Sequence, residues 1–257
     1  MDSNPVRAKL LRGESAIGVM AFEFFTPGLA PVLAAAGAEF VLLDMEHSGA
    51  SIETIKAQVG FARAAGIVPM VRVPFGLHHL ITPILDVGAL GIMAPIIETR
   101  AQAEALVNAC RYRPLGRRGL GFEIGHDRYT GGDALAKMTA ANEVILTIPL
   151  IESIKGVDAA EEIFSVPGID MGWLGHFDLS DSLDRPGNFL DPTYLAAVAK
   201  LKKAAKAAGK PMGWVAPNGP SARAAIAEGF SCVCIGHEVS VLRSALTREI
   251  KAALATS

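Results

Sequence analysis

The sequence alternates between two kinds of segment, and the alternation occurs eight times. A short apolar run, often β-branched, is followed by a longer, alanine-rich segment with helical spacing. Nearly continuous apolar runs are typical of parallel strands that are buried on both faces. The runs occupy residues 16–22, 39–45, 67–73, 90–96, 144–151, 169–175, 211–216 and 231–236. This alternation predicts an α/β fold built from βα units.

Eight βα units in 257 residues match the size of a (β/α)8 TIM barrel. Three predicted helices end in Ala-Ala-Gly directly before the next run, at 35–37, 64–66 and 207–209. Glycine can adopt the left-handed conformation that ends a helix. A doubly wound sheet is the alternative, but it commonly has fewer strands, and no GxGxxG motif follows the first run. We therefore predict one TIM-barrel domain over residues 1–257.

The composition excludes several classes of protein. There are 24 basic and 26 acidic side chains, a net charge of −2, and 51% hydrophobic residues, which argues against a disordered chain. The one basic run, at 200–210, lies on a predicted helix and is interpreted as a solvated face. No apolar stretch is long enough to span a membrane, and the first residues lack the apolar core of a signal peptide. We expect a cytoplasmic protein that binds neither nucleic acid nor membranes.

The three cysteines are Cys110, Cys232 and Cys234. No CxxC spacing is present, so a zinc site is not expected. The pair at 232 and 234 would face the same side of a strand. We interpret all three as small core residues in a reducing compartment.

Two loops interrupt the alternation, at 113–133 and at 180–193. The first is rich in glycine and arginine, and the second is polar. Long loops in compact domains are often functional.

Charged and polar residues gather where the predicted strands end, which is where TIM barrels carry their active sites. These residues are Asp44, Glu46 and His47 after the second strand, Arg72 on the third, Glu98 after the fourth, Glu152 after the fifth, and His176 and Asp178 after the sixth. An apolar barrel has no structural need for so many charges at one rim. Their convergence is therefore a site hypothesis.

Glu152 and Asp178 follow neighbouring strands, so their carboxylates could meet over one ion. Two carboxylates with open positions for water and substrate suit a hard divalent cation. The alternative is that Glu152 caps the next helix and that Asp178 is the N-cap of a short helix.

His47 is a candidate general base, because carboxylates stand one and three residues before it, at Glu46 and Asp44, and a carboxylate partner would fix its tautomer and raise its basicity. The alternative is an ordinary histidine in a polar loop. Arg72 ends an apolar strand and needs a carboxylate partner. That partner is either an oxo-acid substrate or a protein side chain, Asp44 or Asp86.

At these residues the sequence resembles the HpcH/HpaI aldolase family, the metal-dependent class II pyruvate aldolases of the phosphoenolpyruvate/pyruvate barrel superfamily. The matching pieces occur in the family's order and span roughly residues 15–250. They are LLDMEH at 42–47, VRVP at 71–74, ILDVGALGIMAP at 84–95, RYRPLGRRGLG at 111–121, IPLIES at 148–153 and GHFDLS at 175–180. Each piece alone is weak, but together they are specific.

The resemblance implies a role for each matching residue. Glu152 and Asp178 match the family's metal ligands for Mg²⁺, Mn²⁺ or Co²⁺. His47 matches the catalytic base, Asp44 the acid beside it, and Arg72 the arginine that contacts pyruvate and stabilises its enolate.

Further matches concern substrate binding and assembly. The backbone of the turn Gly175, His176 and Phe177 is implied to hold the pyruvate carboxylate. Arg118 matches a loop arginine near the substrate entrance, and Asp86 an acidic residue at the subunit boundary. A homo-oligomer, specifically a hexamer, is implied, with helix 238–254 packing on a neighbouring subunit.

The sequence departs from the family pattern in two places. Many members have Gly-Pro-x-Asp where this chain has Gly175-His176-Phe177-Asp178, so His176 is an additional ligand, base or donor candidate. The insert at 113–133 also differs, and this concerns the choice of aldehyde.

The expected function is therefore reversible, metal-dependent aldol cleavage of a 4-hydroxy-2-oxo acid, of the 4-hydroxy-2-oxoheptanedioate or 2-keto-3-deoxy sugar acid type. The products would be pyruvate and an aldehyde, in the catabolism of aromatic compounds or sugar acids. Four alternatives stay open: a Mg²⁺-dependent lyase acting on an acyl-CoA ester, like the citrate lyase β subunit; a Schiff-base aldolase using Lys155; a non-catalytic binding barrel; and a sugar-phosphate isomerase, which Glu238 disfavours because it would oppose a phosphate.

Overall fold

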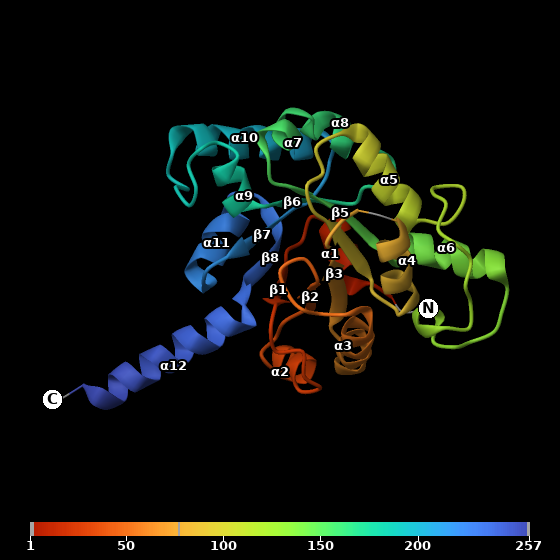
Figure 1. Cartoon of the computed structure of the whole chain (residues 1–257), viewed down its shortest axis with the longest axis horizontal. Helices are drawn as coiled ribbons and strands as arrows, with labels where there is room; N and C mark the ends of the chain where they lie inside the picture. Colours follow the sequence, from red (N-terminus) through yellow and green to blue (C-terminus); the bar gives the residue numbers. More distant parts are fainter. Residues whose placement is uncertain (1–2, 77, 256–257) are drawn as a thin grey trace.

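The structure is a computed structural model, which describes residues 3–76 and 78–255. Eight parallel strands form a closed barrel in sequence order, so the predicted TIM barrel is confirmed (Figure 1). Each strand lies within a predicted run or within one residue of it. They are β1 (Ala16–Ala21), β2 (Phe40–Asp44), β3 (Val68–Arg72), β4 (Gly91–Ala94), β5 (Leu146–Ile151), β6 (Gly172–Leu174), β7 (Met212–Ala216) and β8 (Phe230–His237).

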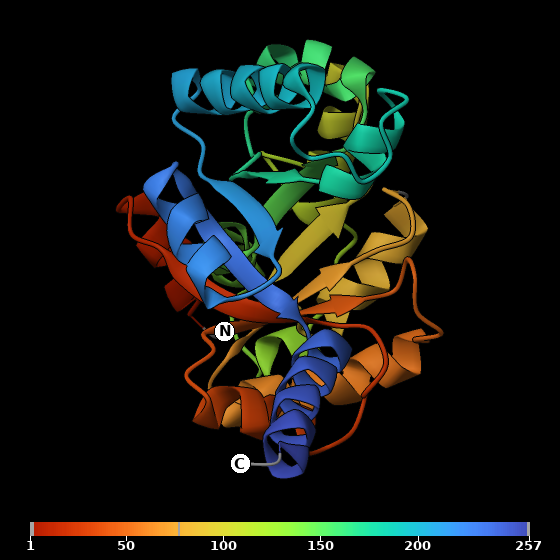
Figure 2. The ribbon, with the colours of Figure 1, turned by 90° about the vertical axis from the view of Figure 1, so that its left-hand side faces the viewer.

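Helices surround the barrel, with α7, α8 and α10 on one side and α2 and α3 on the opposite side (Figure 2). The helices after β1 to β5 are α2 (Leu29–Ala35), α3 (Ile52–Ala65), α4 (His78–Asp86), α5 (Arg100–Cys110), α6 (Ala134–Val144), α7 (Ile154–Asp158) and α8 (Ala160–Phe164). Those after β6 to β8 are α9 (His176–Asp181), α10 (Pro192–Ala207), α11 (Gly219–Ala227) and α12 (Glu238–Leu254). The helical segment between β5 and β6 is divided into α7 and α8.

The period-two alternation of strands divides the apolar residues into two cores. One cluster, which includes Phe40, Met70 and Trp173, fills the barrel interior. The other lies between the strands and the surrounding helices. Gly213 makes room for the Trp173 ring, since a Cβ at this position would overlap it. The interior is therefore a packed core rather than a channel.

A short helix that the sequence did not reveal, α1 (Pro5–Leu11), covers the amino end of the barrel. Its buried Val6 and Leu10 belong to the interior cluster. The Asn4 side-chain amide donates to the carbonyl oxygens of Leu90, at 3.0 Å, and Val144, at 2.7 Å. The barrel is thus closed at this end.

The cysteines are core residues, as predicted: all three are free and buried. Cys232 and Cys234 lie in the barrel interior cluster. Burial raises the pKa of the Cys110 thiol to about 12 and also raises that of Cys232, so both thiols stay protonated and unreactive.

The last helix, α12, extends away from the barrel (Figure 1). It carries exposed apolar side chains on successive turns, namely Val241, Leu242, Leu246, Ile250 and Leu254. Within residues 3–76 and 78–255, no helix is long and apolar enough to cross a membrane.

Candidate active site

The barrel's own periodicity brings the predicted residues to one place. Along β2 the side chains of Phe40 and Leu42 point inward, and Asp44 is the next inward position. Arg72 ends β3 in the same way and is the register partner of Asp44. Glu152 follows the interior residues of β5, and Gly175 those of β6. All four therefore lie at the carboxyl end of the barrel.

Arg72 is held by two carboxylates of the protein. Its Nε lies 2.5 Å from Asp44 Oδ1, and its Nη1 lies 3.2 Å from Glu46 Oε2. The Asp44 side chain is fully buried, and only 10% of the Arg72 side chain is exposed. The internal salt bridge left open by the sequence is thus present with Asp44. Asp86 lies elsewhere, at the end of α4.

Asp44 holds the backbone of the loop that follows it. Its Oδ2 accepts from the His47 N–H at 2.7 Å, and its Oδ1 accepts from the Glu46 N–H at 3.3 Å. The charged group facing the His47 ring is Glu46, whose Oε2 lies 3.8 Å from Nε2. Glu46 and Asp44 are the two carboxylates that the sequence places just before His47, and Glu46 is the one whose charged group lies nearer the ring.

Glu46 is a partly buried carboxylate inside the mouth. Only 15% of its side chain is exposed, and Oε2 is buried with no hydrogen-bond partner among the described residues. Burial raises the pKa of Glu46, while the positive charges of Arg72 and His47 act in the opposite direction. By contrast, 59% of the His47 side chain is exposed.

Glu152 is the more deeply buried acid of the candidate metal pair, with 7% of its surface exposed. Its Oε1 accepts from the Ile96 N–H at 2.7 Å. Ile96 has a φ of 53°, an unusual conformation for a β-branched residue, in the loop after β4. Burial, with the nearby carboxylates of Glu46 and Asp178, raises the pKa of Glu152 to about 7, although the Ile96 N–H and the charge of Arg72 act in the opposite direction.

The helix-capping alternatives for the acidic pair are wrong. Ser153, not Glu152, caps α7, because its side chain accepts from the Gly156 N–H at 3.1 Å. The N-cap of α9 is Gly175, and Asp178 lies in the first turn of this helix.

The close approach of Gly175 to Glu152 shapes the site. A Cβ at Gly175 would lie 2.6 Å from Glu152 Oε2, so only glycine leaves this space open. Among the described residues, no group of three or more His, Cys, Asp and Glu side chains could hold a metal. Glu152 and Asp178 are instead a two-carboxylate set. Their mutual repulsion, and the space beside Gly175, fit a divalent cation that keeps open positions.

The His176 side chain lies in an aromatic cluster. Its ring centroid is 4.7 Å from that of Phe177, 5.2 Å from Phe189 and 5.8 Å from Trp214. Trp214 packs against the core outside the barrel. Burial lowers the pKa of His176 to about 4, so the ring is neutral near pH 7. This environment suits packing rather than proton transfer, and it leaves the turn's backbone as the substrate-binding candidate.

Arg118 lies at the other end of this barrel. Its Nη2 is 2.7 Å from Asp86 Oδ1, and its guanidinium is 4.7 Å from the Tyr112 ring centroid. Because α4 runs back from the carboxyl end of the strands, its last residue, Asp86, is at their amino end. Within one chain, Arg118 and Arg72 cannot contact the same small molecule. The role of Arg118 at a substrate entrance stays a prediction that requires a second subunit.

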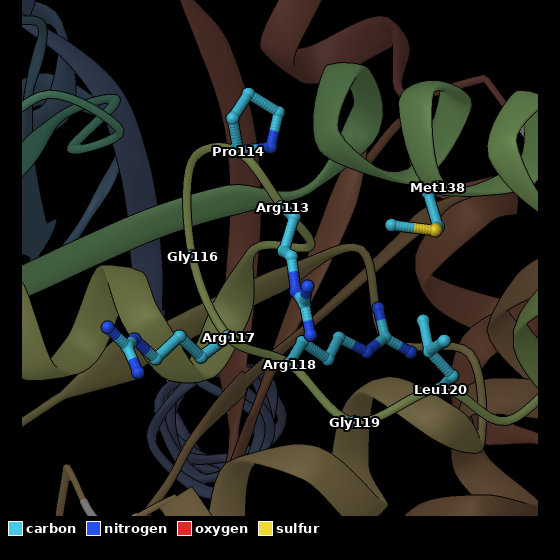
Figure 3. Close-up of a pocket in the computed structure, with 8 residues that line it drawn as sticks. All are labelled: Arg113, Pro114, Gly116, Arg117, Arg118, Gly119, Leu120 and Met138. Carbon is cyan, nitrogen blue, oxygen red and sulfur yellow. The ribbon is translucent and has the colours of Figure 1, made fainter.

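Arg118 also lines a cavity of about 1060 Å³ (Figure 3). In this view Arg113 and Arg118 extend to one side of the loop and Arg117 points the other way. The remaining lining residues are Pro114, Gly116, Gly119, Leu120 and Met138. The cavity belongs to the insert after α5 and is separate from the carboxylate site.

Lys155, the candidate for a Schiff base, is a surface residue. Two thirds of its side chain, 66%, is exposed, and its Nζ lies 3.0 Å from Glu98 Oε2. Glu238 is also engaged: its carboxylate accepts from the N–H groups of Phe22, Glu23 and Phe24. The exposure of Lys155 does not favour a Schiff-base aldolase. The contacts of Glu238 do not favour a phosphate site of a sugar-phosphate isomerase.

The mouth of this TIM barrel holds a buried carboxylate, an arginine and a histidine, residue types that a barrel lyase can use. The family comparison agrees with this class. The HpcH/HpaI aldolase/citrate lyase family model matches residues 20–245, and the chain belongs to this family.

Similar proteins are named for aldolase chemistry. The hydroxypyruvate/pyruvate aldolase of Delftia acidovorans is 35% identical over 246 residues, which cover 95% of this chain and 90% of that protein. The 2-keto-3-deoxy-L-rhamnonate aldolase of Klebsiella pneumoniae is 30% identical, with 96% and 92% covered. The chain is accordingly an aldolase, a carbon–carbon lyase.

Among solved structures, the citrate synthase SbnG is similar, with a TM-score of 0.87 and 30% identity. The match covers 96% of each chain.

Proposed function

We propose that this protein catalyses reversible aldol cleavage of a 4-hydroxy-2-oxo acid to pyruvate and an aldehyde. One observation carries the proposal: the buried carboxylate of Glu152 interacts electrostatically with a second, exposed carboxylate, Asp178, and with Arg72. A metal-chelating 2-oxo acid suits this combination, because it offers a carboxylate and a carbonyl oxygen side by side.

Glu152 and Asp178 would hold the divalent cation, with Mg²⁺, Mn²⁺ and Co²⁺ as candidates. When bound, the ion supplies Lewis-acid stabilisation of negative charge on the substrate. Gly175 keeps the space beside Glu152 open for it.

The chain's own residues account for the movement of protons and charge. His47 takes the proton of the 4-hydroxyl group. The C3–C4 bond breaks, C4 becomes the aldehyde carbonyl, and the electron pair passes to the enolate formed over C2 and C3. Arg72, fixed by Asp44, stabilises the charge on the enolate oxygen. A proton added at C3 then completes pyruvate.

The first turn of α9 supplies the proposed carboxylate contact. The first amide groups of a helix have no partner within the helix. The Gly175 N–H donates to the Ile151 carbonyl oxygen at 3.0 Å, so the N–H groups of His176 and Phe177 are the ones that would orient the substrate carboxylate in this turn. The His176 ring contributes packing only.

A second candidate is a reaction on an acyl-CoA ester, which the similarity to a citrate synthase favours. The aldolase names of relatives that cover more than nine tenths of this chain favour the first candidate. Product analysis separates the two. Incubation with pyruvate and a panel of aldehydes should yield 4-hydroxy-2-oxo acids, and incubation with acetyl-CoA and oxaloacetate should yield no free CoA.

Proton exchange tests the proposed enolate without knowledge of the aldehyde. The protein is incubated with pyruvate in D₂O, and the methyl signal is followed by NMR with EDTA and after Mg²⁺, Mn²⁺ or Co²⁺ is restored. Metal-dependent exchange that is lost in Glu152→Ala supports the proposal. Exchange that survives EDTA would point to Lys155, and no exchange or condensation with any aldehyde would overturn the aldolase proposal.

The proposed assembly is a homo-oligomer, with a hexamer as the specific expectation. The exposed apolar side chains of α12, on an arm that leaves the barrel, support it. Monomeric proteins seldom expose an apolar stripe of this length.

The proposed location is the cytoplasm. The three buried, unpaired cysteines support it, because free thiols are ordinary in a reducing compartment.

A further inference from the structure

We propose that Glu238 is a positioning residue for Arg72: it fixes the loop after β1 so that the ring of Phe22 lies against the Arg72 guanidinium. The inference rests on the proposed function, because it takes Arg72 to be the group that stabilises the enolate. It gives a role at the mouth of the barrel to the first residue of α12, which is far along the chain from the loop that it holds.

The loop after β1 is held by one buried carboxylate. Only 6% of Glu238 is exposed. Its Oε1 accepts from the N–H groups of Phe22 at 2.9 Å, Glu23 at 2.6 Å and Phe24 at 2.9 Å, and its Oε2 lies 3.1 Å from the Phe22 nitrogen. Hydrogen bonds to an ionised acceptor are stronger than those between neutral groups. The path of residues 22–24 therefore depends on Glu238.

Phe22 is the residue through which this loop reaches Arg72. Its ring packs against the barrel interior cluster, and the Arg72 Cζ lies 5.6 Å from the ring centroid. A guanidinium over an aromatic face at this distance is attracted by the ring. His237 contacts the same ring edge-on, with the two centroids 5.1 Å apart. The junction of β8 and α12 thus holds Phe22 twice, by its backbone and by its ring.

The ring of Phe22 complements the two carboxylates that bind Arg72. Asp44 and Glu46 come from β2 and the loop after it, and both contact nitrogen atoms of the guanidinium. Phe22 approaches from β1 and brings an apolar surface instead. An apolar neighbour excludes water, and a charge in a site with less water acts more strongly on an enolate oxygen. Displacing Phe22 should therefore weaken the stabilisation that Arg72 supplies.

The first experiment measures the exchange of pyruvate methyl protons in D₂O, with Mn²⁺ present, over a range of pyruvate concentrations. Glu238→Ala removes the acceptor of three N–H groups. Its kcat should fall roughly 10- to 100-fold with little change in KM, because the enolate charge develops only as the proton leaves. Glu238→Gln keeps Oε1 as an acceptor and should retain most of the parent's kcat. Glu249→Ala, an exposed acid of α12 paired with Arg248, is the control and should match the parent.

Phe22→Leu tests the route by which Glu238 acts. This variant keeps an apolar side chain but loses the aromatic face, and its kcat should fall by a similar factor. The double variant, Glu238→Ala with Phe22→Leu, should lose no more than the larger single loss, since both changes remove one contact. Losses that multiply would overturn the route. Circular dichroism establishes that each variant is folded. If Glu238→Ala does not fold, a parent-like kcat in Phe22→Leu overturns the inference.

The second experiment reads the contact without activity. In protein labelled with ¹⁵N-arginine, Arg72→Lys identifies the Nε–H signal of Arg72. This signal should shift in Phe22→Leu, because the ring current of the aromatic side chain is removed. It should shift in the same direction in Glu238→Ala and stay in place in Glu249→Ala.

The outcomes separate the inference from the proposed function. A parent-like kcat in a folded Glu238→Ala, or an Arg72 signal that does not move, overturns the role of Glu238 while the aldolase activity stands. A parent that exchanges no pyruvate protons and forms no product with any aldehyde overturns the proposed function. The Arg72 signal then still decides whether Glu238 places Phe22 against the guanidinium.

Discussion

At the scale of single residues, the site depends on one position that has no side chain. Gly175 lies against Glu152, and an added Cβ would overlap the Glu152 side chain. The acid has little room to retreat, because its other oxygen is held by the Ile96 N–H.

We expect Gly175→Ala to displace Glu152 and to weaken metal binding by at least tenfold while the barrel stays folded. Calorimetric titration with Mn²⁺, together with circular dichroism, measures both effects. Gly119→Ala, a glycine with open space around its Cβ position, is the control. Unchanged Mn²⁺ affinity in Gly175→Ala would contradict the proposed metal ligand.

The sequence was sufficient to find the residues at the mouth, since the two-residue period of a strand decides which side chains point inward. Asp44, Arg72 and Glu152 each continue an inward series, and this follows from counting along apolar runs. Which of Asp44 and Glu46 lies nearer the His47 ring did not follow, because Glu46 lies in a loop whose path depends on Asp44 accepting backbone N–H groups. The aromatic surroundings of His176 come from β7 and from the 180–193 loop, which no local pattern connects to it.

At the scale of elements, the insert after α5 has an ionic centre at Asp127. This buried carboxylate accepts from Lys137 Nζ at 2.6 Å and from the N–H groups of Glu123 and Ile124. Burial alone would raise the pKa of Asp127, but Lys137 and the Glu123 N–H hold it at about 2.

Asp127→Asn should therefore destabilise the protein by about 1–3 kcal/mol at pH 7. Because the folded pKa is depressed, the contribution is fully present above the ordinary value of 3.8 and is lost as the pH falls through about 2. Urea unfolding at pH 7 and near pH 3 measures the difference, which should shrink at the lower pH. An equal difference at both values would contradict the assignment, and Glu123→Gln, an exposed neighbour, should have little effect.

The helices that the sequence did not reveal share a physical reason. α1 has seven residues, too few for a clear helical period, and it is held by Asn4 bonding to distant carbonyl groups. α6 has apolar residues on more than one side and only one buried residue, Ala141. Both depend on tertiary contacts, whereas the eight strands are specified by their own apolar runs.

At the scale of the whole molecule, α12 is the helix whose apolar side chains are left uncovered in a single chain. Its exposed apolar residues repeat every four positions at Leu242, Leu246, Ile250 and Leu254. This spacing places them along one side of the helix.

Leu246→Asp should reduce the oligomer to smaller species, because a carboxylate would have to be buried in the subunit contact. Light scattering coupled to size-exclusion chromatography measures the mass. Ser244→Asp, on a different side of α12, should keep the parent's mass. A monomeric parent would remove the basis for the hexamer and for any contribution of Arg118 to a neighbouring site.

Over the residues that the structure describes, α1 and the interior core close the floor of the barrel, so under the proposed function substrate would enter and leave through the mouth. Glu152 and Arg72 are buried, whereas His47 is exposed, so in the proposed reaction the oxo-acid half of the substrate would lie inside and the aldehyde half outside. In kinetic terms the order is then fixed by depth. In cleavage the aldehyde would then depart first and pyruvate last, and in synthesis pyruvate would arrive before its acceptor.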